Sequence, residues 1–142
     1  MRADQYLGQI RQLKRQISRK RAESERLLTA AEGMGCAPEG DRVQSSGGMD
    51  KMAELMSRKI DCDREAESLE WASINLTHKI LHEIMGLTNP NYSLLLEMYY
   101  IQCVSIAEIA EEWEKSERHI KRIKVQAVQA FSEKYPESVK KS

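Results

Sequence analysis

The chain has 142 residues, which is enough for one domain or for a small domain with an extended arm. Hydrophobic residues make up 41% of it and aromatic residues only 6%, so it has little bulk for a deep globular core, whereas 31% charged residues suit long exposed helices. The formal net charge is zero, but it averages two basic blocks (residues 1–28 and 115–134) that flank two acidic ones (50–85 and 86–114).

Cysteine usage and hydropathy argue against several classes of protein. Cys36, Cys62 and Cys103 lie far apart and form no CxxC pair, which argues against a disulfide framework or a zinc ribbon and favours a reduced, cytoplasmic protein. The sequence begins without an apolar signal region, and no apolar run approaches the length that spans a membrane. We therefore expect neither secretion nor membrane insertion.

The first predicted element is a helix over residues 4–31. Its apolar residues follow a 4-3-4 spacing, which places them on one narrow helical stripe. That stripe contains Tyr6, Ile10, Leu13 and Ile17, and after a polar gap Leu27 and Leu28. Residues 1–28 carry eight Lys/Arg against three Asp/Glu, so the rest of this helix is basic.

Residues 32–49 interrupt the helical pattern. Five glycines, a proline and two serines mark a flexible loop, and we interpret this segment as a linker. An interaction loop or an anion-binding loop around residues 43–48 is the alternative, because Gly-Gly and Ser can present backbone amides.

A second long helix is predicted over residues 50–85. Its near-heptad stripe contains Leu55, Cys62, Ala66, Leu69, Ser73, Leu76, Ile80 and Ile84. A helix of this length cannot bury its stripe against itself, so it needs a partner. The basic first helix would give an antiparallel, coiled-coil-like hairpin, and a second copy of the chain would give a homo-oligomer. The sequence leaves both open.

A compact helical domain is expected to follow the long helix. Gly86 suits the C-terminus of that helix, and Asn89 before Pro90 suits an N-cap and first helical residue. We therefore divide the chain near residue 87, into a hairpin arm (1–86) and a helix-turn-helix domain (87–142). The fold class expected is all-α.

Three helices are predicted within this domain. The first covers residues 89–102, the second opens with Ser105 in a capping box with Glu108, and the third opens with Ser116. The inward positions of the last two helices are Ile106, Ile109, Ala110, Trp113, Ile120, Ile123, Ala127, Ala130 and Phe131.

The last two helices fit a DNA-reading helix-turn-helix. Ala110 supplies a small residue at the helix crossing, and Arg118, Lys121 and Arg122 point away from the apolar anchor. Arginine can bind guanine through two hydrogen bonds, and both residue types neutralise phosphates. Ser116 and His119 lie near the helix start, where donors can meet a phosphate. A merely solvated basic face has the same pattern and is the competing interpretation.

The segment LLLEMYYIQCVSIAEIAEEWEKSERHIKRIKVQAVQAF resembles the promoter-reading helix-turn-helix of sigma factors, their fourth conserved region. With YLGQIRQLKRQI, the phrase GDRVQSSGGMDKMAE and the long acidic helix, the chain resembles the sigma-like late-gene activators of phages and prophages, of the RinA and ArpU type. The resemblance implies sequence-specific binding of double-stranded DNA, transcription control through host RNA polymerase, and a recognition role for residues 116–124. The DNA-binding residues expected are Ser116, Arg118, His119, Lys121, Arg122 and Lys124.

The chain departs from this family at the turn. Glu114 stands where the family usually has glycine, and Lys115 stands where it has an apolar residue. A residue other than glycine in a left-handed turn costs roughly 1 kcal/mol, which a packed domain tolerates. We therefore expect an unusual turn at Glu114.

Other functions remain as alternatives. A small terminase subunit also combines a helix-turn-helix with long oligomerising helices, and a helical protein-interaction module would use the hairpin alone. We do not expect an enzyme or a cofactor, because no phosphate loop or catalytic pairing stands out. His78 and His82 could share a metal ion, but a plain surface pair is the simpler interpretation, so no metal site is expected.

Overall fold

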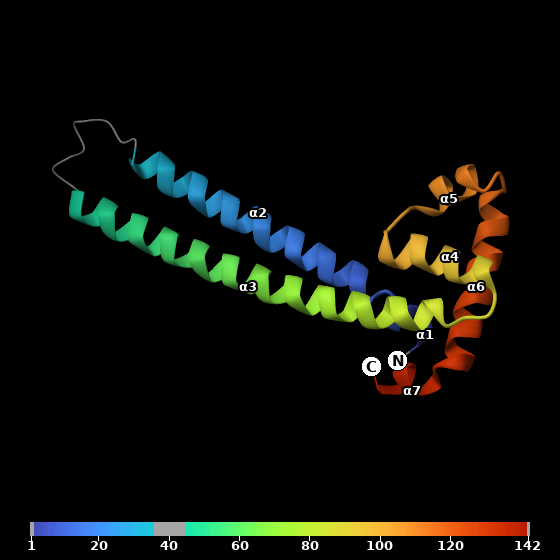
Figure 1. The fold of residues 1–142 in the computed structure, drawn as a ribbon. Helices are drawn as coiled ribbons and strands as arrows, with labels where there is room; N and C mark the ends of the chain where they lie inside the picture. Colours follow the sequence, from blue (N-terminus) through green and yellow to red (C-terminus); the bar gives the residue numbers. More distant parts are fainter. Residues whose placement is uncertain (1, 36–44, 142) are drawn as a thin grey trace. The chain divides into compact units, whose positions relative to one another are not determined.

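The computed structural model describes residues 2–35 and 45–141, and this part of the chain forms helices and no strand (Figure 1). The prediction of an all-α fold is confirmed. The helices are α1 (Ala3–Leu7), α2 (Gln9–Gly35), α3 (Ser45–Met85), α4 (Pro90–Leu96), the π-helix η2 (Glu97–Ile101), α5 (Ile106–Glu112), α6 (Glu117–Lys134) and α7 (Pro136–Lys141). None of the described helices combines the length and apolar character needed to cross a membrane.

Packing divides the chain into two compact units. We call Lys14–Ala72 the hairpin unit, and Met1–Leu13 together with Ser73–Ser142 the helix-turn-helix unit. The sequence predicted a single boundary near residue 87, with everything before it in the arm. The contacts instead group residues from both ends of the chain into one unit. The first residues of the chain and the last turns of α3 therefore belong with the helix-turn-helix.

In the hairpin unit, α2 and α3 form the expected antiparallel pair. Cys62 and Ala66 of the predicted α3 stripe are buried, as are Ser24 and Ala31 of α2. Burial raises the pKa of the Cys62 thiol, as expected for a cysteine in the helix interface.

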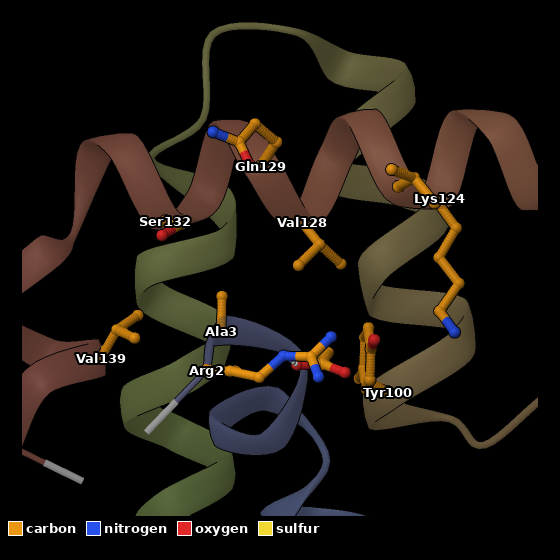
Figure 2. A pocket seen from close by; sticks show the side chains of 10 residues that line it. Arg2, Ala3, Tyr100, Lys124, Val128, Gln129, Ser132 and Val139 are labelled. Atoms are coloured by element: carbon orange, nitrogen blue, oxygen red, sulfur yellow. Dashed lines mark ion pairs between the residues drawn. The ribbon is translucent and has the colours of Figure 1, made fainter.

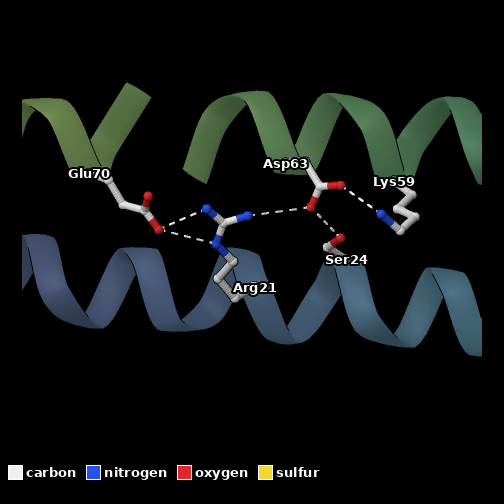
Figure 3. Close-up of polar contacts among 5 residues, drawn as sticks. All are labelled: Arg21, Ser24, Lys59, Asp63 and Glu70. Atoms are coloured by element: carbon white, nitrogen blue, oxygen red, sulfur yellow. Dashed lines mark hydrogen bonds and ion pairs between the residues drawn. The ribbon is translucent and has the colours of Figure 1, made fainter. Parts of the chain in front are cut away.

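Opposite charges join the two helices of the hairpin unit (Figure 3). Lys20 contacts Glu65 at 2.5 Å, and the Arg21 guanidinium contacts Glu70 at 2.8 Å and Asp63 at 3.7 Å. Each of these exposed pairs contributes about 0–1 kcal/mol to the free energy of unfolding. Their main effect is therefore on which helices pair, and their effect on stability is small. They are the contacts expected between a basic first helix and an acidic second one.

The long helices extend beyond the predicted bounds. Helix α2 continues to Gly35 and α3 begins at Ser45, so residues 32–35 and 45–49 of the expected loop are helical. Glycine costs only about 1 kcal/mol relative to alanine in a helix, and neighbouring turns can offset this. Residues 36–44 of the expected loop, including Val43 and Gln44, lie outside the described residues.

The first helix is interrupted at Gly8, between α1 and α2. A Cβ at this position would lie 3.0 Å from the Asp4 carbonyl oxygen, a contact that glycine avoids. Tyr6 and Ile10, on either side of the interruption, are both fully buried.

Two apolar clusters form the core of the helix-turn-helix unit. The larger cluster joins α1, the start of α2, the end of α3, α4, η2, α6 and α7. Its fully buried members are Tyr6, Leu7, Ile10, Ile80, Ile84, Leu96, Ala127 and Phe131. The smaller cluster packs α5 against α6 and α4, through Leu95, Met98, Ile109, Ala110 and Ile120. The expected inward positions of both helices of the motif are thus buried or half-buried.

A buried carboxylate connects three segments of this core. Glu83 of α3 accepts hydrogen bonds from the Tyr6 hydroxyl, at 2.5 Å, and from the Ser138 hydroxyl of α7. Burial, then the hydrogen bond to Glu83, raises the pKa of the Tyr6 phenol, so Tyr6 remains the donor. Helix α7 was not predicted, although Pro136 occupies its first position as the rule for helix starts allows.

Candidate nucleic-acid interface

Side-chain caps define where the motif helices begin. The Ser105 hydroxyl oxygen accepts from the Glu108 amide at 3.2 Å, and Ser116 accepts from the His119 amide at 3.1 Å. Asn89 caps α4 in the same way, accepting from the Asn91 amide at 2.9 Å. These helix starts agree with those predicted, and each cap is worth about 1 kcal/mol.

The turn of the motif is left-handed at Glu114, where φ is 55°. The Lys115 amide donates to the Ala110 carbonyl at 2.9 Å, and the Glu114 amide donates to the Glu111 carbonyl at 3.3 Å. This pair of bonds is a Schellman motif, whose left-handed position normally holds glycine. The expectation of an unusual turn at Glu114 is confirmed.

A second left-handed residue, Cys103, with φ 58°, ends the helix before the motif. Here the Val104 amide donates to the Met98 carbonyl at 2.9 Å, one residue wider than in the Schellman pattern. The π-helix η2 explains the extra residue, because its Gln102 amide already reaches back to Glu97.

Helix α6 separates a buried side from an exposed basic side. Ile120, Ala127 and Phe131 are buried, and Arg118, Lys121 and Arg122 are exposed. None of these three cations forms a salt bridge within residues 2–35 and 45–141. Their charge is therefore available to an external anion.

The other three predicted contact residues have contacts within the chain. Ser116 is exposed and caps α6 through its oxygen, yet its hydroxyl proton can still be donated. His119 is half-buried. Lys124 is also half-buried, and its ammonium lies 4.2 Å from the centre of the Tyr99 ring.

The exposed side of α6 continues for more than one turn beyond the predicted residues, to Gln129. Gln126 and Gln129 are exposed, and Val125 has 69% of its surface exposed. One apolar and two amide side chains in a row with the cations give this face the mixture of groups that meets base edges.

Arg2 and Arg11, from the other end of the sequence, also lie in this unit and were not predicted. The Arg11 guanidinium lies 4.4 Å from the centre of the Tyr99 ring, so two cations share that ring. Arg2 lines a hollow of about 450 Å³ with α6 residues (Figure 2). The only feature of the sequence that hints at these contacts is the net charge of +5 over the first 28 residues. That charge does not predict which residues Arg2 and Arg11 contact.

The histidine pair offers no third ligand. His78 and His82 are exposed on α3, and no group of three or more His, Cys, Asp or Glu side chains is arranged to hold a metal ion within the described ranges.

Comparison with protein-family models, with curated proteins and with solved structures finds no match to this chain.

Proposed function

We propose that the chain is a sequence-specific, double-stranded-DNA-binding transcription regulator that reads the major groove with α6. The supporting observation is the arrangement of that helix. Arg118, Lys121 and Arg122 are exposed and free of salt bridges in the described chain, opposite a fully buried side. The groove of B-DNA is about 12 Å wide, which admits one helix.

The supporting helix has the charge expected of an element that stays away from DNA. Glu108, Glu111 and Glu112 of α5 and Glu114 of the turn are exposed. Phosphates repel these carboxylates, so a duplex would be oriented toward α6. Glu117 in the first turn of α6 favours the helix electrostatically, because its carboxylate lies near the positive end of the helix dipole.

The family resemblance suggests the target genes, the partner and the location of the regulator. A sigma-like motif activates transcription of phage or prophage genes, with host RNA polymerase as partner and the bacterial cytoplasm, at the nucleoid, as location. The hairpin unit is then the arm that meets a second copy or the polymerase. These assignments rest on the sequence resemblance and the geometry of α6 together.

Selection from a random duplex library tests DNA binding directly. We expect enrichment of one sequence and an affinity that falls steeply with salt, because each neutralised phosphate contributes about −0.9 to the slope of log K against log salt. No enrichment, or binding that is indifferent to salt, would contradict the proposal.

Genome-wide mapping of bound DNA in a lysogenic host separates the regulator from a terminase subunit. A regulator is expected upstream of late genes, and a terminase subunit at a packaging site. A third variant carries alanine at Arg118, Lys121 and Arg122 together. If it keeps the function of the wild-type chain, the function does not depend on DNA binding, and the protein-interaction module is favoured.

A further inference from the structure

In the helix-turn-helix unit, three cations from distant parts of the sequence are linked through Tyr99 and Tyr100. Arg2 precedes α1, Arg11 lies in the first turns of α2, and Lys124 lies in α6. Arg11 and Lys124 lie over the same Tyr99 ring, at 4.4 and 4.2 Å, and Lys124 is also 5.7 Å from the Tyr100 ring centre. Tyr100 lines the hollow with Arg2 and Lys124, and Figure 2 shows these two side chains reaching toward it, Arg2 from just before α1 and Lys124 from α6.

The chain itself balances this charge only in part. Among the residues that line the hollow, Asp4 is acidic, and Arg2 and Lys124 are basic. The Asp4 carboxylate lies 3.5 Å from the Arg2 guanidinium. Arg11 and Lys124 have no carboxylate partner in the part of the chain that is described. Two cations held against one ring repel one another, and an anion close to both reduces this repulsion. The electrostatics therefore favour a bound anion here.

The hollow adjoins the exposed side of α6. Val125, Gln129 and Ser132 line it, and Val125 and Gln129 also continue the row of Arg118 and Arg122. Seven residues separate Arg122 from Gln129, which is about 10 Å along a helix axis. This is close to the width of the major groove, about 12 Å. If α6 crosses the groove with Arg122 at the base edges, the hollow comes close to a phosphate strand that borders the groove.

We propose that this hollow receives a backbone phosphate of the duplex that α6 reads, through Arg2 and Lys124, which line it. Arg11, which shares the Tyr99 ring with Lys124, is proposed to contact the phosphate strand beside the hollow. The inference rests on the proposed function and extends the site to the start of the chain. Contacts of this kind fix the position of a protein on DNA without reading sequence. Tyr99 holds Arg11 and Lys124 in place before DNA arrives, which reduces the entropy lost on binding.

The test measures binding of variants to the selected duplex and to a scrambled duplex across a salt series. Arg2→Gln and Arg11→Gln are expected to weaken binding to both duplexes by the same factor and to reduce the salt slope by about 1 each. Asp4→Asn is expected to act in the opposite direction and tighten binding to both. Arg64→Gln, an exposed arginine of α3 in the hairpin unit, is the matched control and is expected to change neither.

Two further arms make the result specific. Arg11→Lys keeps the charge, so it is expected to retain the salt slope even if the packing on Tyr99 loosens, and thermal unfolding of every variant confirms folding. Competition by inorganic phosphate at constant ionic strength distinguishes a free anion from a duplex: displacement of Arg2-dependent binding at millimolar phosphate would assign the hollow to the small anion and overturn the proposal.

The remaining outcomes are equally decisive. Unchanged slopes in Arg2→Gln and Arg11→Gln overturn the inference while the proposed function survives, since the wild-type chain still selects its duplex. A loss confined to the selected duplex shows base reading and also overturns it. A wild-type chain that binds no duplex contradicts the proposed function, and the inference with it.

Discussion

The Lys115 amide donates to the Ala110 carbonyl at 2.9 Å, and this bond closes the end of α5 around Glu114. Glu114 is held at φ 55°, where the Cβ of an L-residue costs roughly 1–2 kcal/mol. The tight turn is therefore formed without the glycine that such a turn favours, because packing of Ile109, Ala110 and Ile120 fixes both helices. The same bond sets the direction in which α6 leaves the turn.

Glu114→Gly is expected to stabilise the chain by about 0.5–1 kcal/mol, since it removes the left-handed penalty but adds freedom to the unfolded chain. Urea unfolding measures the shift in midpoint. Glu114→Gln is the control, because it removes the charge beside the end of α5 and keeps the Cβ. A glycine variant no more stable than the glutamine variant would show that the backbone there is unstrained.

Tyr6→Phe is expected to destabilise the chain by about 1–3 kcal/mol, because it leaves the buried Glu83 carboxylate short of one donor. Tyr92→Phe is the matched control: the Tyr92 hydroxyl donates to exposed Gln126 at 3.3 Å, where water can replace it. Denaturant unfolding of both variants gives the comparison. Equal losses would mean that the buried bond has no special weight.

Asp63 gives the hairpin unit a predictable response to acid. Hydrogen bonds from Lys59, at 2.7 Å, and from Ser24, at 2.5 Å, lower the pKa of its carboxyl below the ordinary value of 3.8 (Figure 3). Because the folded pKa lies below the unfolded one, the stabilisation is fully present above the unfolded value and is lost as pH falls toward the folded value.

Thermal unfolding of the wild-type chain and of Asp63→Asn at several pH values tests this response. Wild type is expected to be the more stable above about pH 5, and the gap is expected to close as pH falls below about 4. Asp61→Asn, an exposed aspartate on the same helix, is the control. A gap that stays constant down to pH 2 contradicts the assignment.

Local rules were sufficient to predict most of the fold. The caps at Asn89, Ser105 and Ser116 fixed helix starts, and apolar periodicity found both stripes of the hairpin, because each signal lies within one or two turns. The ends near Gly35 and Ser45 were missed since glycine weakens a helix without ending it.

The candidate site was predicted less completely, for a physical reason. The exposure of Arg118, Lys121 and Arg122 follows from the period of a single helix. The contacts of Arg2 and Arg11 depend on where residues about a hundred positions away pack, and no local pattern carries that information. Lys124 illustrates the same limit, since Tyr99 and Tyr100 on another helix decide where its ammonium lies.

The affinity of Arg122→Ala for the selected duplex tests the central claim most directly, with Arg64→Ala as the control of equal charge. The account predicts that Arg122→Ala weakens binding to the selected duplex by about 1–3 kcal/mol, with much less effect on a scrambled one, and that Arg64→Ala changes neither. Unchanged affinity of Arg122→Ala for the selected duplex would contradict the assignment of α6 as the helix that reads DNA.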